Sequence, residues 1–173
     1  MKSASKIVVL EDDRSTRGLI TGFLEKAGYQ VYEASEGRYA IELVMQQRPA
    51  LLIADIMLPD MDGAEVVKML LETSNGANLK VLFLTSLLSK NGIRHQETKL
   101  KVAGNEFPAL SKPFNPKVLI SIANRLVGEA LEVEEAAAAK AKAAIEAQAA
   151  MEASVAIQTA AVESALAEDA KTE

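Results

Sequence analysis

Short apolar runs and amphipathic segments alternate through the first 128 residues of the chain. The apolar runs predict strands, and the amphipathic segments, whose apolar residues recur every three or four positions, predict helices. The expected strands cover residues 7–10, 29–34, 51–55, 81–85 and, more weakly, 107–110. The clearest expected helices cover residues 15–26, 39–44, 64–73 and 116–127. This order predicts a domain of five strands and five helices with a mostly parallel sheet.

Right-handed crossover connections restrict the topology of such a chain to a few arrangements. The commonest one for five strands is the flavodoxin-like α/β fold, a three-layer (βα)5 sandwich with the parallel strand order 2-1-3-4-5. In that order the first and third strands are neighbours, so Glu11, Asp12 and Asp55 should converge at one carboxyl edge. Thr85 ends the fourth strand and Lys112 follows the fifth, so both can reach the same crevice.

The fourth helix along the chain has the weakest pattern, between residues 86 and 111. Gly92 and Gly104 interrupt it, and Leu100 and Val102 belong to a thin apolar stripe. We therefore expect this helix to be short, mobile or irregular. The lone His95 lies among basic residues of the same segment, which favours a surface residue over a catalytic one.

The composition of the chain changes sharply after Gly128. Residues 129–173 contain 18 alanines among 45 residues and no glycine, proline or aromatic residue. This stretch has 10 acidic and 3 basic residues, a charge of −7, whereas the whole chain carries −5, which leaves +2 for residues 1–128. We therefore predict two parts: an α/β domain at 1–128, and an acidic tail at 129–173 that is neither a DNA-binding nor a catalytic output domain.

The tail has the composition of a helix. Alanine, glutamate, lysine, glutamine and methionine are strong helix formers, and 45 such residues would extend about 68 Å if fully helical. The helix could continue directly from the one before it, because Gly128 is a weak break. Its larger apolar residues only partly fit a heptad; they are Ile145, Met151, Val155, Val162 and Leu166. A solvated or partly disordered extension and a docking or homo-oligomerising helix therefore both stay open.

The bulk properties exclude several classes of function. A net charge of −5 gives no general reason to expect nucleic-acid binding, and the absence of cysteine excludes disulfides and thiolate metal sites. No apolar run approaches the roughly 18 residues of a membrane span, and the first six residues lead into a strand rather than a signal sequence. We expect a cytoplasmic protein without membrane insertion.

The polar residues expected at the sheet edge form a coherent chemical set. Oxygen ligands without histidine or cysteine suit a hard cation such as Mg²⁺, which would also offset the repulsion between clustered carboxylates. A carboxylate beside the metal can attack a phosphoryl group and form an acyl phosphate. The metal and a lysine ammonium would neutralise the equatorial oxygens, and a hydroxyl could hydrogen-bond one of them.

Each of these residues also has an ordinary structural explanation. The acidic run Glu11 to Asp13 could cap the next helix, where the helix dipole favours negative charge. Asp55 could form an Asx turn, Thr85 could be an ordinary strand threonine, and Lys112 could be a solvated surface residue. The joint convergence of four separate segments favours the chemical interpretation.

The motifs that carry these residues identify a family resemblance. They are Val9 to Asp13, Asp55 to Gly63, Leu84 to Ser86 and Ser111 to Phe114. In this order and spacing, residues 5–127 resemble the receiver domain of bacterial two-component response regulators. The resemblance implies a phosphorelay switch that is not an enzyme beyond its own phosphorylation and dephosphorylation. It also implies a histidine kinase or phosphotransfer protein as donor and a downstream protein target, whose identity the sequence leaves open.

The same resemblance assigns roles within the site. It implies that Asp55 is the phosphoacceptor and that Glu11, Asp12, Asp55 and the backbone carbonyl of Met57 bind Mg²⁺. It further implies that Thr85 is the switch hydroxyl and that Lys112 binds the phosphoryl group. In the family, the lysine at this position is followed by a cis peptide bond to proline.

One position departs from the family pattern. Receiver domains usually carry an aromatic switch residue three positions before the lysine, and here that position is Ala109. Phe107 should share the face of Ala109, but nearly two residue rises further from the phosphate position.

Three functions follow from these observations. The first is the phospho-accepting switch, and the second is a pseudo-receiver scaffold or oligomerisation protein whose tail carries the function. The third is an aspartyl phosphohydrolase, although the haloacid-dehalogenase-like enzymes have Asp-x-Asp after their first strand, and Asp55-Ile56-Met57 lacks the second acid.

Overall fold

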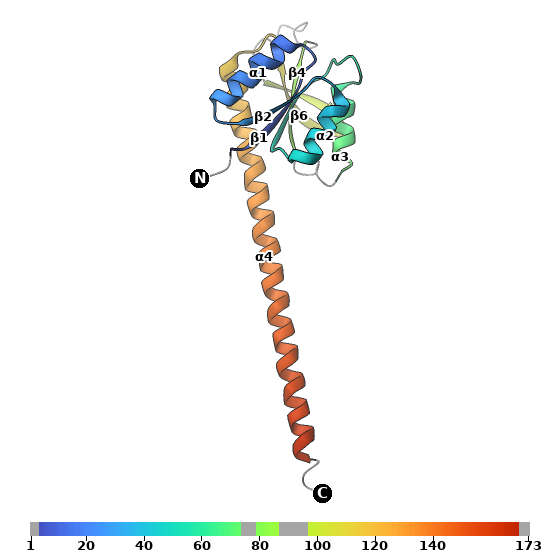
Figure 1. Cartoon of the computed structure of the whole chain (residues 1–173), viewed down its shortest axis with the longest axis vertical. Coiled ribbons are helices and arrows are strands. Elements are labelled where there is room, and N and C mark those ends of the chain that lie inside the picture. Colours follow the sequence, from blue (N-terminus) through green and yellow to red (C-terminus); the bar gives the residue numbers. More distant parts are fainter. Residues whose placement is uncertain (1–3, 74–78, 87–96, 170–173) are drawn as a thin grey trace. The chain divides into compact units, whose positions relative to one another are not determined.

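The computed structural model describes residues 4–73, 79–86 and 97–169, with side chains described as far as residue 160. The chain divides into two compact units, residues 1–132 and 133–173. The first unit contains a six-stranded sheet with the order β2-β1-β3-β4-β6-β5. Figure 1 shows this unit with its sheet and its helices. The predicted flavodoxin-like fold is confirmed, because the five predicted strands are parallel neighbours in the expected order.

The central strands are apolar on both faces. They are β1 (Lys6–Leu10), β3 (Leu51–Asp55) and β4 (Lys80–Thr85), and β2 (Gln30–Ala34) lies at one edge of the sheet. All five residues of β3 are buried, as expected for a parallel strand covered on both faces. Their alternate side chains enter two separate hydrophobic clusters, one on each face of the sheet.

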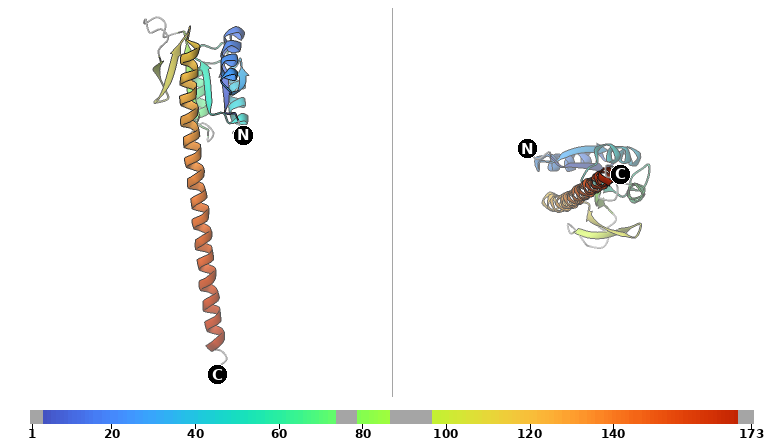
Figure 2. Two further views of the ribbon diagram at one scale, coloured as in Figure 1. Left: turned by 90° about the vertical axis from the view of Figure 1, so that its left-hand side faces the viewer. Right: turned by 90° about the horizontal axis from the view of Figure 1, so that it is seen from below.

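Helices cover both faces of the sheet and complete the three layers. The helices α2 (Gly37–Gln47) and α3 (Gly63–Leu71) pack on one face, where Leu43, Val66 and Leu70 are buried. On the other face, α1 (Arg14–Lys26) and the first turns of α4 (Pro116–Asp169) bury Ile20 and Leu119 (Figure 2). Burial of these faces provides most of the driving force for folding the unit.

The segment before the last parallel strand differs from the prediction. Residues 97–102 form a strand, β5 (Glu97–Val102), which pairs antiparallel with β6 (Asn105–Ser111). The expected fourth helix is therefore wrong for this part of the segment, and Leu87, Gly92 and His95 lie outside the described residues. Since Leu100 and Val102 pack on the α2/α3 face and Lys99 and Lys101 are exposed, their spacing of two was the signal of a strand.

A tight turn joins β5 and β6. Ala103 and Gly104 have φ values of 49° and 85°, the pattern of a type I′ turn, in which both central residues are left-handed. Val102 and Asn105 flank the turn as a hydrogen-bonded pair. From there along the hairpin, non-hydrogen-bonded and hydrogen-bonded pairs alternate. Pro108 then falls opposite Lys99, at a position where no N–H of β6 is needed for pairing with β5.

The second unit is the continuation of α4. The helix runs through Gly128 without a break, and residues 131–160 are exposed along their whole length. The prediction that the tail is a separate part beginning at residue 129 stays a prediction. The larger exposed apolar side chains of the tail are Val133, Ile145, Met151, Val155 and Ile157.

The hairpin turn gives a test of this fold. Ala103 adopts a left-handed conformation that costs an L-residue about 1 kcal/mol, whereas asparagine tolerates it well. We expect Ala103→Asn to raise the free energy of unfolding by about 0.5–1 kcal/mol and Ala103→Val to lower it. Urea denaturation measures both. A loss of stability in Ala103→Asn would contradict the turn geometry.

Candidate functional site

Three acidic residues meet at the carboxyl ends of β1 and β3. Leu10 pairs with Ala54 in the ladder, which places the next residues, Glu11 and Asp55, side by side. Glu11 is 2% and Asp55 6% exposed, whereas Asp12 is exposed to solvent. One carboxylate oxygen from each of the three lies within 4.8 Å of the others. The structure thus brings the predicted acidic residues together.

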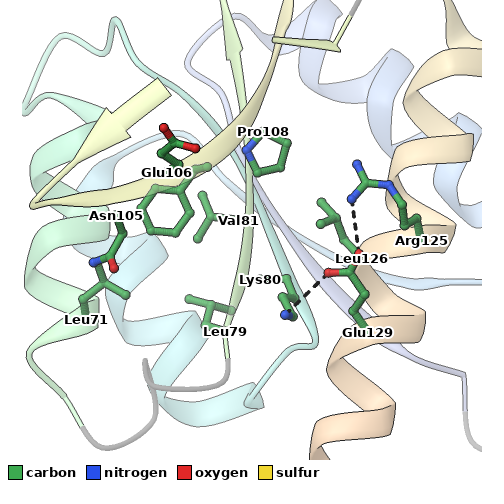
Figure 3. Close-up of a pocket in the computed structure, with 11 residues that line it drawn as sticks. Leu71, Leu79, Lys80, Val81, Asn105, Glu106, Pro108, Arg125, Leu126 and Glu129 are labelled. Carbon is green, nitrogen blue, oxygen red and sulfur yellow. Dashed lines mark hydrogen bonds and ion pairs between the residues drawn. The ribbon is translucent and has the colours of Figure 1, made fainter. Parts of the chain in front are cut away.

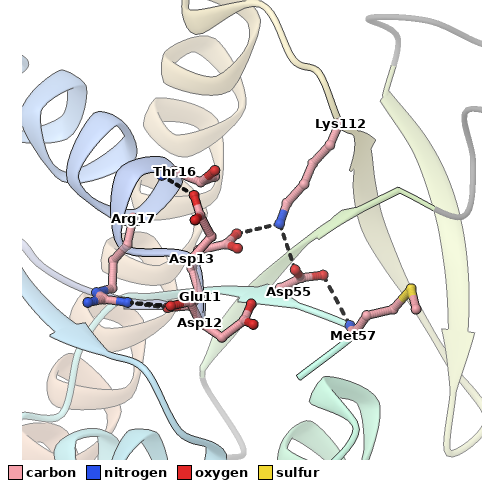
Figure 4. Close-up of polar contacts among 8 residues, drawn as sticks. All are labelled: Glu11, Asp12, Asp13, Thr16, Arg17, Asp55, Met57 and Lys112. Carbon is pink, nitrogen blue, oxygen red and sulfur yellow. Dashed lines mark hydrogen bonds and ion pairs between the residues drawn. The ribbon is translucent and has the colours of Figure 1, made fainter. Parts of the chain in front are cut away.

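Lys112 completes this cluster from the end of β6. Its Nζ lies 2.6 Å from Oδ2 of Asp55 and also donates a hydrogen bond to Oε2 of Glu11 (Figure 4). Its backbone N–H donates to the carbonyl of Thr85 at 2.9 Å, which holds the start of the loop against β4. The peptide bond between Lys112 and Pro113 is cis, as predicted.

Burial and ion pairing together shift the pKa values of Glu11 and Lys112. Burial raises the pKa of the Glu11 carboxyl, and the hydrogen bond and charge of Lys112 only partly offset this. For Lys112, burial lowers the pKa, but the hydrogen bonds to Asp55 and Glu11 outweigh it, so its pKa lies above the usual value. The ammonium is therefore charged throughout the neutral range.

The helix-cap explanation applies to only one of the three consecutive acids. Asp13 is the N-cap of α1, where its Oδ1 accepts from the N–H of Thr16 at 2.8 Å. This hydrogen bond lowers the pKa of Asp13. Glu11 and Asp12 turn toward Asp55 instead, so the acidic run serves both the helix and the cluster.

Arg17 is a site residue that the sequence analysis missed. Its Nη1 donates to the backbone carbonyl of Glu11 at 2.6 Å and to that of Asp12 at 3.1 Å. These contacts fix the backbone that carries both acids. The only signal in the sequence was a basic residue one helical turn after the N-cap, which is too common to indicate a role.

The loop after Asp55 returns sharply toward the strand. The N–H of Met57 donates to Oδ1 of Asp55 at 3.1 Å, and the N–H of Gly63 donates to the carbonyl of Ile56 at 2.9 Å. A Cβ on Gly63 would lie 1.9 Å from the carbonyl oxygen of Asp55, so only glycine fits there. The side chain of Met57 is 58% exposed beside the cluster.

Thr85 and Phe83 lie on β4, the strand next to that of Asp55, and Phe107 lies on β6, one strand further out. Thr85 is fully buried at the end of β4 and pairs with Ser111. Ala109 is fully buried on the same face as Phe107, as the strand parity predicted. The ring of Phe107 packs edge-on against Phe83, with 6.0 Å between centroids and an interplanar angle of 81°. Phe107, the aromatic residue of β6, is partly buried and packs against the core.

A pocket of about 370 Å³ lies at the opposite, amino-terminal ends of β4 and β6. On its charged rim, Glu129 of α4 pairs with Lys80 of β4 at 3.6 Å and with Arg125 at 3.2 Å (Figure 3). Arg125 also pairs with Glu97 of β5 at 2.5 Å, so ion pairs join three elements. These pairs tie the hairpin to the first turns of α4. The pocket lies too far from Asp55 to belong to the acidic cluster.

Comparison with known proteins identifies the family. The protein-family model of the response regulator receiver domain matches residues 7–124 of this chain. The chain belongs to the response regulator receiver family. Receiver domains are in general signalling modules of two-component systems rather than enzymes.

Curated response regulators are similar to this receiver domain. The response regulator MprA of Mycobacterium ulcerans is 32% identical over 133 residues, which is 76% of this chain and 54% of that protein. The alkaline phosphatase synthesis transcriptional regulatory protein PhoP of Bacillus subtilis is 35% identical over 115 residues, or 65% of this chain and 44% of that protein. The chain thus spans about half the length of these relatives, and 8% of a similar histidine kinase of Formosa agariphila.

Solved receiver structures have the same fold. The chemotaxis protein CheY4 of Vibrio cholerae is 28% identical with a TM-score of 0.60, and the match covers 72% of this chain and 99% of that protein. A CheY-like receiver domain of Methanospirillum hungatei has a TM-score of 0.61 at 23% identity, over 75% of this chain and 98% of that one.

In the described residues, no helix combines the length and the apolar character needed to cross a membrane.

The acidic cluster fits the Mg²⁺ that receiver domains typically bind. Its donors are carboxylate oxygens without nitrogen or sulfur, and two of them are buried, which suits a hard divalent cation. In the structure the ammonium of Lys112 partly neutralises Glu11 and Asp55. Its single charge leaves an acidic surplus in the cluster once Asp12 is included.

The dependence of the cluster on Lys112 can be tested. In Lys112→Ala, two buried carboxylates lose their cation, so we expect the free energy of unfolding to fall by about 3 kcal/mol near pH 8 without Mg²⁺. The folded pKa of Glu11 is already raised and should rise further. A carboxyl whose folded pKa is raised destabilises the protein once the pH rises through that pKa, because it is then buried as an anion. Near pH 5 more of Glu11 is protonated, so Lys112→Ala should lower the free energy of unfolding by less than at pH 8.

Urea denaturation at both pH values measures this effect. The pKa of Lys112 in the wild type is also raised, and the stability that a raised lysine pKa provides is lost only above the usual lysine pKa. Lys112 therefore contributes fully to the free energy of unfolding at both pH values. The exposed Lys117, in the first turn of α4, provides the control variant Lys117→Ala. An equal loss at both pH values would contradict the electrostatic role of Lys112.

Proposed function

We propose that this receiver domain accepts a phosphoryl group on Asp55 from a histidine kinase or phosphotransfer protein and signals through protein–protein contact. The observation that carries the proposal is the convergence of Asp55, Glu11, Asp12 and Lys112 at one sheet edge. Asp55 has the position that a nucleophile needs, at the end of a rigid buried strand and next to a bound ammonium.

The proposed transfer is a displacement at phosphorus. A carboxylate oxygen of Asp55 attacks the phosphoryl group of a phosphohistidine, the P–N bond breaks as the O–P bond forms, and the leaving imidazole takes a proton from solvent. The ammonium of Lys112, which pairs with Asp55, would then bind an oxygen of the phosphoryl group on Asp55. The hydroxyl of Thr85 would donate a hydrogen bond to another such oxygen after a shift of β4.

Mg²⁺ is the proposed cofactor. The residues that would hold it are Glu11, Asp12, Asp55 and the backbone carbonyl of Met57. When bound, the ion would supply positive charge for the phosphoryl oxygens. Arg17 supports the site without touching the ion, because it holds the carbonyls of Glu11 and Asp12.

The hairpin makes the output surface unusual. In the family, phosphorylation is read out on the face formed by the fourth helix, the last strand and the last helix. In this chain β5 pairs directly with β6, and Glu97 of β5 pairs with Arg125 of α4. We propose that the downstream target contacts this hairpin, with no nucleic acid involved, in a cytoplasmic pathway.

The second candidate is a pseudo-receiver scaffold that oligomerises through its tail. Two observations favour it: Ala109 replaces the usual switch aromatic, and the tail exposes several large apolar side chains on a helix. Met151 and Val155, 71% and 52% exposed, are four residues apart and therefore share one face of this helix.

Phosphorylation of Asp55 is tested by intact-mass analysis after incubation with Mg²⁺ and acetyl phosphate. We expect one added phosphoryl group on the wild type and none on Asp55→Asn. The matched control is Asp62→Asn, an exposed acid of the same loop, which should still be modified. An unmodified wild type, with both acetyl phosphate and a kinase as donor, would refute the proposal and favour the scaffold.

Self-association of the tail is tested by sedimentation of the full chain over a range of concentrations. If the scaffold candidate is correct, the wild type should form an oligomer that Met151→Glu and Val155→Glu dissociate. Ala153→Glu is the control, because it places the same charge on nearly the opposite face of the helix. A wild type that stays monomeric at high concentration would exclude oligomerisation through the tail.

A further inference from the structure

The loop that follows Asp55 is tied to the start of α2. Oδ2 of Asp60 accepts a hydrogen bond from the N–H of Gly37 at 2.8 Å, across 23 residues of sequence. Gly37 is the first residue of α2, and its N-cap residue, Glu36, makes no side-chain cap bond. Asp60 therefore satisfies an N–H that the helix itself leaves unpaired, and its negative charge lies at the favourable end of the helix dipole.

Close packing reinforces this hydrogen bond. A Cβ on Gly37 would lie 2.5 Å from Cγ of Met61 and 2.7 Å from Cγ2 of Val66. The loop residue Met61 thus rests directly on the backbone of α2, at a distance that only glycine permits. Asp60 and Met61 hold the outer part of the loop at one place.

The inner part of the same loop is held against Asp55. The N–H of Gly63 donates to the carbonyl of Ile56. The backbone of Gly63 lies so close to the carbonyl of Asp55 that a Cβ at this position would not fit. Met57 lies between these two anchors, and its N–H already contacts the carboxylate of Asp55. A change at Asp60 can therefore reach Met57 through only two intervening residues, one of which is the rigid Pro59.

We infer that Asp60 is a positioning residue that fixes the loop around Met57 through α2 and thereby strengthens Mg²⁺ binding at the acidic cluster. The inference rests on the proposed function, since it concerns the proposed metal site. Asp60 itself lies outside the acidic cluster. Its effect is thus to keep the backbone of the loop in place before the ion arrives, which lowers the cost of ordering it on binding.

Mg²⁺ affinity of the full chain, measured by calorimetry, tests this role. We expect Asp60→Ala to weaken Mg²⁺ binding about five- to tenfold, because a lost cap bond of this kind has effects of that size. Asp60→Asn keeps an acceptor oxygen and should restore most of the affinity. Gly37→Ala, which pushes Met61 away from the other side, should weaken binding as Asp60→Ala does.

Two further measurements separate positioning from general stability. Asn115→Ala is the matched control, because Asn115 caps a different helix, α4, by accepting from the N–H of Lys117 at 2.9 Å. It should lose stability and keep the Mg²⁺ affinity of the wild type. In phosphorylation by acetyl phosphate, Asp60→Ala should require more Mg²⁺ for half-maximal rate while the rate at saturating Mg²⁺ stays near that of the wild type.

Each outcome decides the question. Unchanged Mg²⁺ affinity in Asp60→Ala, or in Gly37→Ala if the first variant does not fold, would overturn the positioning role. Equal weakening in Asn115→Ala would also overturn it, because the effect would then follow stability alone. A wild type that binds no Mg²⁺ would overturn the proposed metal site itself, which is a different result.

Discussion

The ammonium of Lys112, shared by two buried carboxylates, is the interaction on which the carboxyl edge of this sheet depends. Glu11 and Asp55 are neighbours because β1 and β3 pair in a fixed register, so their proximity is imposed by the sheet. Two such groups are costly to bury unless a cation lies between them. The backbone hydrogen bond from the N–H of Lys112 to the carbonyl of Thr85 holds this lysine against β4. The ion pairs of Lys112 therefore depend on the positions of four strands, β1, β3, β4 and β6.

Supporting contacts around this centre come from elements distant in sequence. Arg17 of α1 holds the carbonyls before Asp13, Gly63 folds the loop back on Asp55, and Asp60 fastens that loop to α2. Each contact acts on backbone rather than on a functional side chain. The site is therefore ordered mainly by main-chain geometry, and the ionisable groups are placed by it.

The sequence was sufficient for the parts that depend on local pattern and order. Parallel strands with buried faces, the strand order, the family and the convergence of Asp55 with Lys112 all follow from apolar periodicity and from motifs at strand ends. It was insufficient where tertiary pairing decides. The segment from Glu97 to Val102 alternates, but its charged positions and the glycines around it resemble an irregular helix. The partners of Arg17 and Asp60 are visible only once the chain has folded. The helix that runs through Gly128 was, in contrast, expected from the sequence, because one glycine is a small penalty among strong helix formers.

The hairpin also changes how the sheet ends. β5 is the last strand in the described part of the sheet, and the alternation set by its turn directs the backbone groups of Glu97, Lys99 and Lys101 away from β6. Such an edge is a template on which another chain could add a strand. Here any added strand would meet Lys99 and Lys101, side chains of the kind that protect sheet edges, although Lys99 also pairs with Glu106 at 3.0 Å. Two lysines thus help to protect the edge that β5 forms in the described part of the sheet.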